Sequence, residues 1–211
     1  MLHKDSFTIA PETFKLIQEL QVIPDLSEFY LVGGTSLALQ LGHRNSVDID
    51  LFSQNEFDNE WVTSVVKKHF QFELIYNFKS TLIGILNDHI KTDFIRHNYP
   101  FVKPPITEEG ITFLSKEDIA AMKLNAIANS GKRLKDFIDI YFLLEHFSVR
   151  DMLDFFATKY PNYNKLIPLR AINYFDEIDP EIDPPKMKKN IPLKEIKKRI
   201  EDAVLHSKKT Y

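Results

Sequence analysis

Two aspartates one residue apart, Asp48 and Asp50, interrupt the apolar segment VDIDLF (47–52). On a strand, residues i and i+2 project from the same side, with Cα atoms about 6.5–7 Å apart. Two carboxylates this close repel each other unless a cation lies between them. Oxygen-only ligation of this kind suits Mg²⁺ or Mn²⁺. The spacing therefore indicates a divalent metal site, and two strand-end aspartates facing solvent are the alternative.

A glycine pair, Gly33-Gly34, precedes these aspartates and separates an apolar run, FYLV (29–32), from a segment with helical spacing. Glycines allow backbone N–H groups to approach a phosphate, and a helix N-terminus favours negative charge there. Thr35 and Ser36 add hydroxyl groups at the same place. This order of elements, a strand, a tight turn and a helix followed by the aspartate pair, predicts a phosphate-binding turn next to a metal site.

Arg44 and Ser46 lie just before the aspartates and could contact the phosphates of a nucleotide. A surface arginine and a turn serine would explain them equally well. Other catalytic patterns are missing from the sequence, which has no cysteine, no HExxH pair, no G-x-S-x-G elbow and no P-loop. The glycine pair and the two aspartates are therefore the strongest chemical signal in the first half.

The elements that would position these residues follow from hydrophobic spacing and turn residues. In the first half, helices are expected at 11–21, 35–42 and 57–70, and strands at 29–32, 47–52, 72–78, 81–87 and 89–97. A short turn at Asn87-Asp88 predicts a hairpin between the last two strands. After the prolines of 102–106 only helices are expected, at 117–129, 134–147, 149–160, 164–175 and 193–207.

Length and composition are those of a globular protein. The 211 residues suffice for one large domain or two small ones, and 44% are hydrophobic and 27% charged. No segment approaches the roughly 20 apolar residues of a membrane span, and the first residues do not resemble a signal peptide. We therefore expect a cytoplasmic protein without membrane contact.

The second half carries two further charge patterns. Lys123 lies between apolar positions of one helix, and Asp136 and Asp139 lie three residues apart on the next, hence on one face. From residue types alone, Asp136 would pair with a basic neighbour and Lys123 would extend to water. Between Lys186 and Lys209, nine Lys or Arg residues outnumber three acids. Such a helix could contact RNA or an acidic partner, although a solvated helix face is the simpler interpretation.

The stretch LVGGTSLALQLGHRNSVDIDLF (31–52) resembles the signature of the DNA-polymerase-β-like nucleotidyltransferase superfamily. More narrowly, it resembles the AbiEii/AbiGii toxin family of abortive-infection and toxin–antitoxin nucleotidyltransferases. The resemblance extends to Lys123 and to residues 135–140, where Lys135 replaces the usual arginine. It implies an α+β fold: a polymerase-β-like mixed sheet with helices in 1–102, followed by a helical bundle in 103–211 that completes the active-site cleft.

The resemblance also implies roles for individual residues. Asp48 and Asp50 would bind Mg²⁺ or Mn²⁺, and Asp93 would supply a third carboxylate and help to activate the attacking group. Lys123 would reach the triphosphate oxygens and stabilise the leaving pyrophosphate. Asp139 and Asp136 would orient that lysine or the acceptor.

The function that the resemblance implies is metal-dependent transfer of a nucleoside monophosphate from an NTP to an RNA, such as a tRNA 3′ end, or to a protein. The protein would act as a toxin, with a cognate antitoxin as partner. One alternative is a non-catalytic member of the fold that binds nucleotide or antitoxin. A glycosyltransferase with a DxD pair is a poorer match, because only 47 residues precede Asp48 and Gly33-Gly34 would be unexplained.

Overall fold

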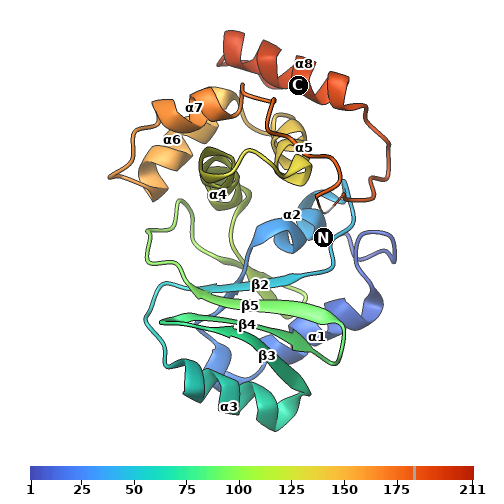
Figure 1. The fold of residues 1–211 in the computed structure, drawn as a ribbon, viewed down its shortest axis with the longest axis vertical. Coiled ribbons are helices and arrows are strands. Elements are labelled where there is room, and N and C mark those ends of the chain that lie inside the picture. Colours follow the sequence, from blue (N-terminus) through green and yellow to red (C-terminus); the bar gives the residue numbers. More distant parts are fainter. Residues whose placement is uncertain (183) are drawn as a thin grey trace. The chain divides into compact units, whose positions relative to one another are not determined.

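The computed structural model describes residues 1–182 and 184–211 (Figure 1). The chain forms two compact units. The first contains residues 1–99 and 105–114, and the second contains residues 100–104 and 115–211. The sequence predicts a single boundary after residue 102, whereas the observed division assigns 105–114 to the first unit.

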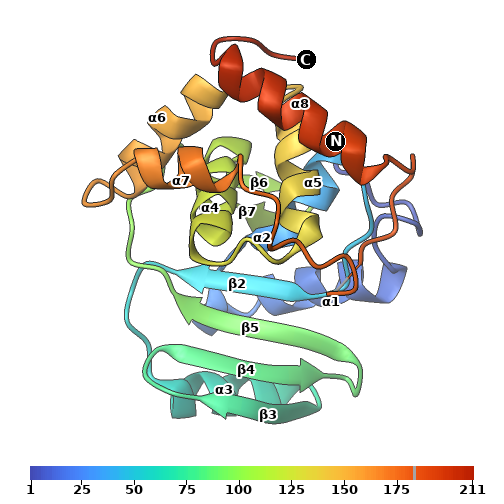
Figure 2. The same cartoon turned by 45° about the horizontal axis from the view of Figure 1, so that its top comes forward.

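The first unit is built on a mixed sheet whose seven described strands follow the order β3-β4-β5-β2-β1-β7-β6. The strands are β1 (Tyr30–Leu31), β2 (Ile49–Ser53), β3 (Phe72–Asn77), β4 (Thr81–Leu86), β5 (Ile90–Arg96), β6 (Ile106–Glu108) and β7 (Ile111–Phe113). Strand β2 runs parallel to β5, and β1 runs parallel to β7. The other neighbouring pairs are antiparallel. Figure 2 shows β2, β5, β4 and β3 side by side.

The hairpin predicted at Asn87-Asp88 is confirmed by the antiparallel pairing of β4 with β5. Asn87 and Asp88 adopt positive φ angles of 49° and 69°. Asn and Asp tolerate this left-handed region better than other residues with a side chain, which explains their place in the turn.

Three α-helices accompany this sheet: α1 (Pro11–Gln21), α2 (Gly33–Leu41) and α3 (Asn59–His69), with a short 3₁₀ turn at Pro24–Leu26. Helix α2 ends at Gly42, whose φ of +65° is the left-handed cap that the sequence predicts. Helix α3 begins after Asp58, whose carboxylate accepts hydrogen bonds from the backbone of Glu60 and Trp61. One end of α2 and one end of α3 therefore coincide with a capping residue.

The core of this unit lies on one face of the sheet. Leu82, Leu86 and Phe94 are buried there together with Val62 and Val66 of α3. Residues of α1 belong to the same cluster. Because side chains alternate along a strand, the neighbours of these core residues project from the opposite face. That opposite face carries Asp50 and Asp93.

The hairpin β6–β7 is absent from the elements that the sequence predicts. Its strands have only three residues each, and Gly110 between them has a φ of +77°. Strand β7 joins the sheet through a parallel pairing of Phe113 with Leu31. Such short strands carry too few residues for a period-two pattern, and the partner is distant in sequence.

The second unit is helical, as expected. It contains α4 (Lys116–Asn129), α5 (Leu134–Leu143), α6 (Val149–Lys159), α7 (Leu166–Ala171) and α8 (Leu193–Leu205). Ser115 caps α4, and Ser148 with Asp151 forms a capping box on α6. Helix α8 buries a stripe formed by Ile196, Ile200 and Ala203. Among the residues described, no helix has both the length and the apolar character needed to cross a membrane.

Candidate active site

Asp50 of β2 and Asp93 of β5 are direct partners in the parallel register of the two strands. Partner residues on neighbouring strands project from the same face, and the strands lie about 4.8 Å apart. Asp50 is partly exposed, and the side chain of Asp93 retains 13% exposure. The sheet therefore brings together two of the three carboxylates that the resemblance assigns to metal binding.

Gly33 lies against the carboxylate of Asp50. Its φ is +68°, and a β-carbon at this position would come within 2.1 Å of Asp50 Oδ2. The turn is also tied to β2 through the backbone, because Val32 N donates a 2.9 Å hydrogen bond to the carbonyl of Asp50. Both the backbone angle and the close approach require glycine here.

Gly34 makes the same kind of approach to Arg44. A β-carbon on Gly34 would lie 2.5 Å from Arg44 Nη2 and 3.4 Å from Ser46 Oγ. Arg44 is only 3% exposed, and its Nη1 donates to the carbonyl of Asn45 at 2.9 Å. Arg44 is thus a buried cation beside the glycine turn, which excludes the surface-arginine interpretation.

The hydroxyl groups of the turn bond to the chain itself. Thr35, which is buried, donates to the backbone carbonyl of Asp48, and its Oγ1 lies 2.8 Å from Ser46 Oγ. Ser36 is also buried and accepts a 3.1 Å hydrogen bond from Gln40 Nε2. Thr35 therefore fixes the backbone of Asp48.

Asp48 lies one residue before β2, not inside the strand as the sequence predicts, because the ladder begins at Ile49. The residue is partly buried. Within residues 1–182 and 184–211, its carboxylate has neither a hydrogen-bond nor an ion-pair partner. A carboxylate with its oxygens available is suited to binding a cation.

Asp93 has a partner that the sequence interpretation missed. Lys91, two residues earlier on the same strand, places its Nζ 2.6 Å from Asp93 Oδ1 and 2.7 Å from Oδ2. Among the residues that the structure describes, no group of three or more His, Asp or Glu side chains is arranged to hold a metal ion. The i, i+2 spacing of Lys91 and Asp93 was the available signal for this pair.

The donor set nevertheless fits a divalent cation. Asp48, Asp50 and Asp93 offer carboxylate oxygens only, which is the chemistry that Mg²⁺ and Mn²⁺ prefer. The missing side chain of Gly33 makes the room that the Asp50 carboxylate occupies. Asp48 can accept a cation directly, whereas Asp93 can do so once its pair with Lys91 opens.

In the helical unit, Lys123 lies between two aspartates. Its Nζ is 2.7 Å from Asp136 Oδ1 and 2.7 Å from Asp139 Oδ2. Lys123 is 5% exposed, Asp136 1% and Asp139 0%. The lysine does not extend to water; it is the buried counter-ion of both carboxylates, so the structure brings together the three residues that the resemblance groups.

Arg133 completes this cluster. Its Nε lies 3.1 Å from Asp136 Oδ2, and its Nη2 lies 3.2 Å from Oδ1. Such a two-point contact with one carboxylate is available to the planar guanidinium of arginine and not to the ammonium of a lysine. Sequence interpretation considered basic neighbours of Asp136 but could not choose among them.

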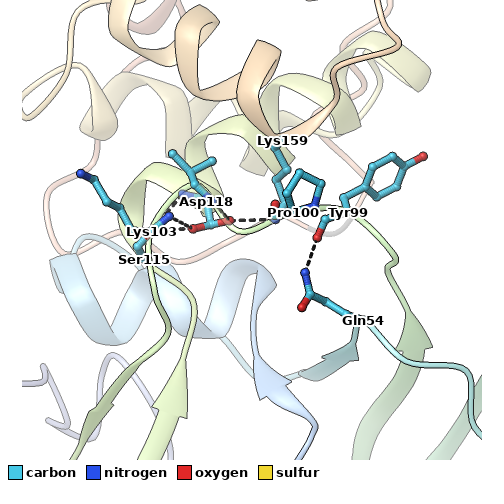
Figure 3. A network of polar contacts seen from close by, with 8 residues as sticks. Gln54, Tyr99, Pro100, Lys103, Ser115, Asp118 and Lys159 are labelled. Carbon is cyan, nitrogen blue, oxygen red and sulfur yellow. Dashed lines mark hydrogen bonds and ion pairs between the residues drawn. The ribbon is translucent and has the colours of Figure 1, made fainter.

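A second buried cluster of the helical unit was not predicted. Asp118, which is fully buried, accepts hydrogen bonds from the backbone of Val102 and Lys103 at 3.0 and 3.1 Å, and from Ser115 Oγ at 2.7 Å (Figure 3). Lys159 Nζ lies 2.8 Å from the same carboxylate. The cluster fixes residues 100–104 to the start of α4 and the end of α6.

Comparison with known proteins points to one family. The family model described as "Nucleotidyl transferase AbiEii toxin, Type IV TA system" matches residues 15–206. An uncharacterized protein of Aquifex aeolicus (strain VF5) is 33% identical over 162 residues, which cover 74% of this chain and 78% of the relative.

Two crystal structures from Helicobacter pylori share the fold. A putative nucleotidyltransferase is 17% identical with a TM-score of 0.54, over 92% of this chain and 91% of the other. The protein JHP933 is 17% identical with a TM-score of 0.52, over 92% and 88%. The likeness confirms the α+β fold predicted from the sequence.

Proposed function

Because the chain belongs to the AbiEii nucleotidyltransferase toxin family and is therefore a nucleotidyltransferase, we propose that it transfers a nucleoside monophosphate from an NTP to an RNA. Pyrophosphate would be released. The observation that supports this most directly is the carboxylate of Asp50, which is held against Gly33 with Asp93 beside it.

Asp48 and Asp50 would hold Mg²⁺ or Mn²⁺, and Asp93 would complete the set. A bound divalent ion supplies positive charge that offsets the phosphate oxygens and the developing charge of the reaction. The role of the chain is to fix the carboxylates. Thr35 holds the backbone of Asp48, and the β2–β5 ladder aligns Asp50 with Asp93. Asp93 would also accept the proton of the attacking hydroxyl.

The glycine turn would bind the phosphates. Backbone N–H groups at the start of α2 have no partners within the helix, and the helix dipole favours an anion there. Gly33 and Gly34 allow Asp50 and Arg44 to approach the backbone of the turn, and Arg44 adds a buried positive charge directly beside Gly34. Ser36 and Ser46 flank the same turn.

Lys123 would contribute positive charge to the triphosphate, with Asp136 and Asp139 orienting its ammonium group. The two 2.7 Å ion pairs fix the lysine in one position, as an oriented cation requires. The same contacts also serve stability, so activity and stability must be measured separately for variants of these residues.

RNA is favoured over protein as the acceptor by the charge of the C-terminal segment. Nine Lys or Arg residues face three acids between Lys186 and Lys209, and Lys194 and Lys198 are exposed on α8. Such a surface attracts a polyanion. As a toxin acting on RNA in the cytoplasm, the protein would be paired with a cognate antitoxin.

The test is label transfer from each of four α-³²P-labelled NTPs to RNA or protein, with Mg²⁺. Asp50→Asn removes the charge and keeps the shape, and Asp25→Asn, at an exposed position on the 3₁₀ turn, is the matched control. We expect Asp50→Asn to lower transfer at least about 100-fold, the scale found when one electrostatic contact to the reacting charge is lost.

Equal transfer by Asp50→Asn and the parent would refute the proposed site. Labelled protein in place of RNA would refute the acceptor assignment alone. Binding of NTP with metal, without transfer to any acceptor, would indicate the non-catalytic alternative.

A further inference from the structure

The pair formed by Lys91 and Asp93 occupies the position where a metal ligand is expected. The two residues lie on the same face of β5, and the lysine ammonium contacts both carboxylate oxygens at 2.6 and 2.7 Å. A cation bound by both oxygens of Asp93 would lie at the same place. Two cations cannot share these oxygens at such distances, because like charges repel.

The neighbours of this pair offer Lys91 no other acid across the β4–β5 ladder. On β4, Ile85 is opposite Lys91 and Ile83 is opposite Asp93. On β2, Asp50 is the partner of Asp93. Lys91 thus places one positive charge directly on Asp93, beside the strand position of Asp50.

The lysine is also able to leave. Its side chain is 43% exposed, whereas that of Asp93 is 13% exposed. A lysine ammonium on a flexible four-carbon stem changes position more readily than a planar guanidinium bound at two points. Asp93 is fixed by the sheet, so the pair can open by movement of Lys91 alone.

We propose that Lys91 is a built-in counter-ion of the metal site, which neutralises Asp93 in the metal-free protein and competes with the divalent cation for its oxygens. This inference rests on the proposed function, in which Asp93 is a metal ligand. In this role Lys91 lowers the affinity of the site for the metal ion. Removing its ammonium group should therefore tighten metal binding, whereas removing a metal ligand should weaken it.

The test is a Mn²⁺ titration followed by electron paramagnetic resonance of the free ion, at constant pH and ionic strength and without nucleotide. Lys91→Met removes the charge and keeps an unbranched side chain. Lys67→Met makes the same change at an exposed position of α3, which packs on the opposite face of the sheet. Lys91→Arg keeps the charge, and Asp50→Asn removes a ligand.

We expect Lys91→Met to bind Mn²⁺ about tenfold more tightly than the parent. The ammonium group and the metal ion compete for the same two oxygens of Asp93, so its loss removes both the competitor and the repulsion between two neighbouring positive charges. Lys67→Met should match the parent. Lys91→Arg should bind equally or more weakly, because arginine holds a carboxylate at two points.

Unchanged or weaker Mn²⁺ binding by Lys91→Met, in a protein whose far-ultraviolet circular dichroism is that of the parent, would overturn the counter-ion inference while leaving the proposed function intact. If Lys91→Met does not fold, Lys91→Gln serves for the same comparison. Failure of every variant and of the parent to bind Mn²⁺ would overturn both the inference and the metal assignment of the proposed function.

Discussion

The carboxylate of Asp50 lies so close to the α-carbon of Gly33 that a β-carbon would come within 2.1 Å of Oδ2. One methyl group therefore suffices to displace the proposed metal ligand. The contact also links the two parts of the sequence signature, the glycine pair and the aspartate pair, through direct packing.

Replacing Gly33 with alanine should abolish activity by moving Asp50. Gly110→Ala is the matched control, because Gly110 has a similar φ of +77° but only Gln18 Nε2, at 3.8 Å, near its would-be β-carbon. Both variants should lose about 1–2 kcal/mol from the left-handed backbone, measured by urea unfolding. Only Gly33→Ala should lose Mn²⁺ binding and label transfer. Equal activity of the two variants would show that the position of Asp50 is not critical.

Replacing Lys123 with methionine should destabilise the helical unit strongly. The change leaves Asp136 and Asp139 buried, with only Arg133 remaining among the cations that contact Asp136 in the described structure. Breaking a buried pair in this way typically costs about 3–5 kcal/mol. The double variant Lys123→Met/Asp139→Asn should recover part of this loss. If Lys123→Met lowers the free energy of unfolding in urea by less than about 1 kcal/mol, the ion pairs of Lys123 with Asp136 and Asp139 do not stabilise the helical unit as proposed.

Replacing Asp118 with alanine should destabilise the protein by a similar amount, because Lys159 would remain buried without its carboxylate and two backbone N–H groups would lose their acceptor. The expected loss is about 3–5 kcal/mol, measured by urea unfolding. Asp154→Ala, on the exposed side of α6, is the control. If Asp118→Ala is as stable as that control, the cluster does not hold residues 100–104.

Tyr141 should report the docking of α8 at high pH. Burial, followed by its hydrogen bond to Glu195 of α8, raises the pKa of Tyr141 from 10.0 to about 12. Because the folded pKa is the higher one, this contribution to stability is complete below pH 10 and is lost as pH rises from 10 to 12. The ultraviolet difference titration between the parent and Tyr141→Phe should therefore show ionisation near pH 12. Glu195→Gln should lower that midpoint; an unchanged midpoint would refute the role of Glu195.

Local signals in the sequence were sufficient for most of the elements. The helix end at Gly42 and the hairpin at Asn87-Asp88 depend on backbone angles that few residue types adopt, so their positions could be predicted. Hairpin β6–β7 could not, because its three-residue strands are stabilised by pairing with the distant Leu31. Asp48 was placed inside a strand that begins one residue later, a typical error at an element boundary.

In the candidate site, the sequence predicted some of the side-chain contacts and missed others. The resemblance grouped Lys123 with Asp136 and Asp139, and the observed ion pairs agree with that grouping. It did not reveal the contact of Lys91 with Asp93. Each of these acids has several basic residues near it in the sequence. Which basic side chain forms the ion pair depends on the directions of the side chains in the folded protein.

The parallel register of β2 and β5 determines both which residues of β5 enter the core and which carboxylates lie side by side. A slip of β5 by a single residue would turn Asp93 toward the helix-covered core and bring Thr92 or Phe94 beside Asp50. Insertions within β5 should therefore be more damaging than insertions in the loops at its ends, since they would bury a charge and dismantle the acidic site in one event.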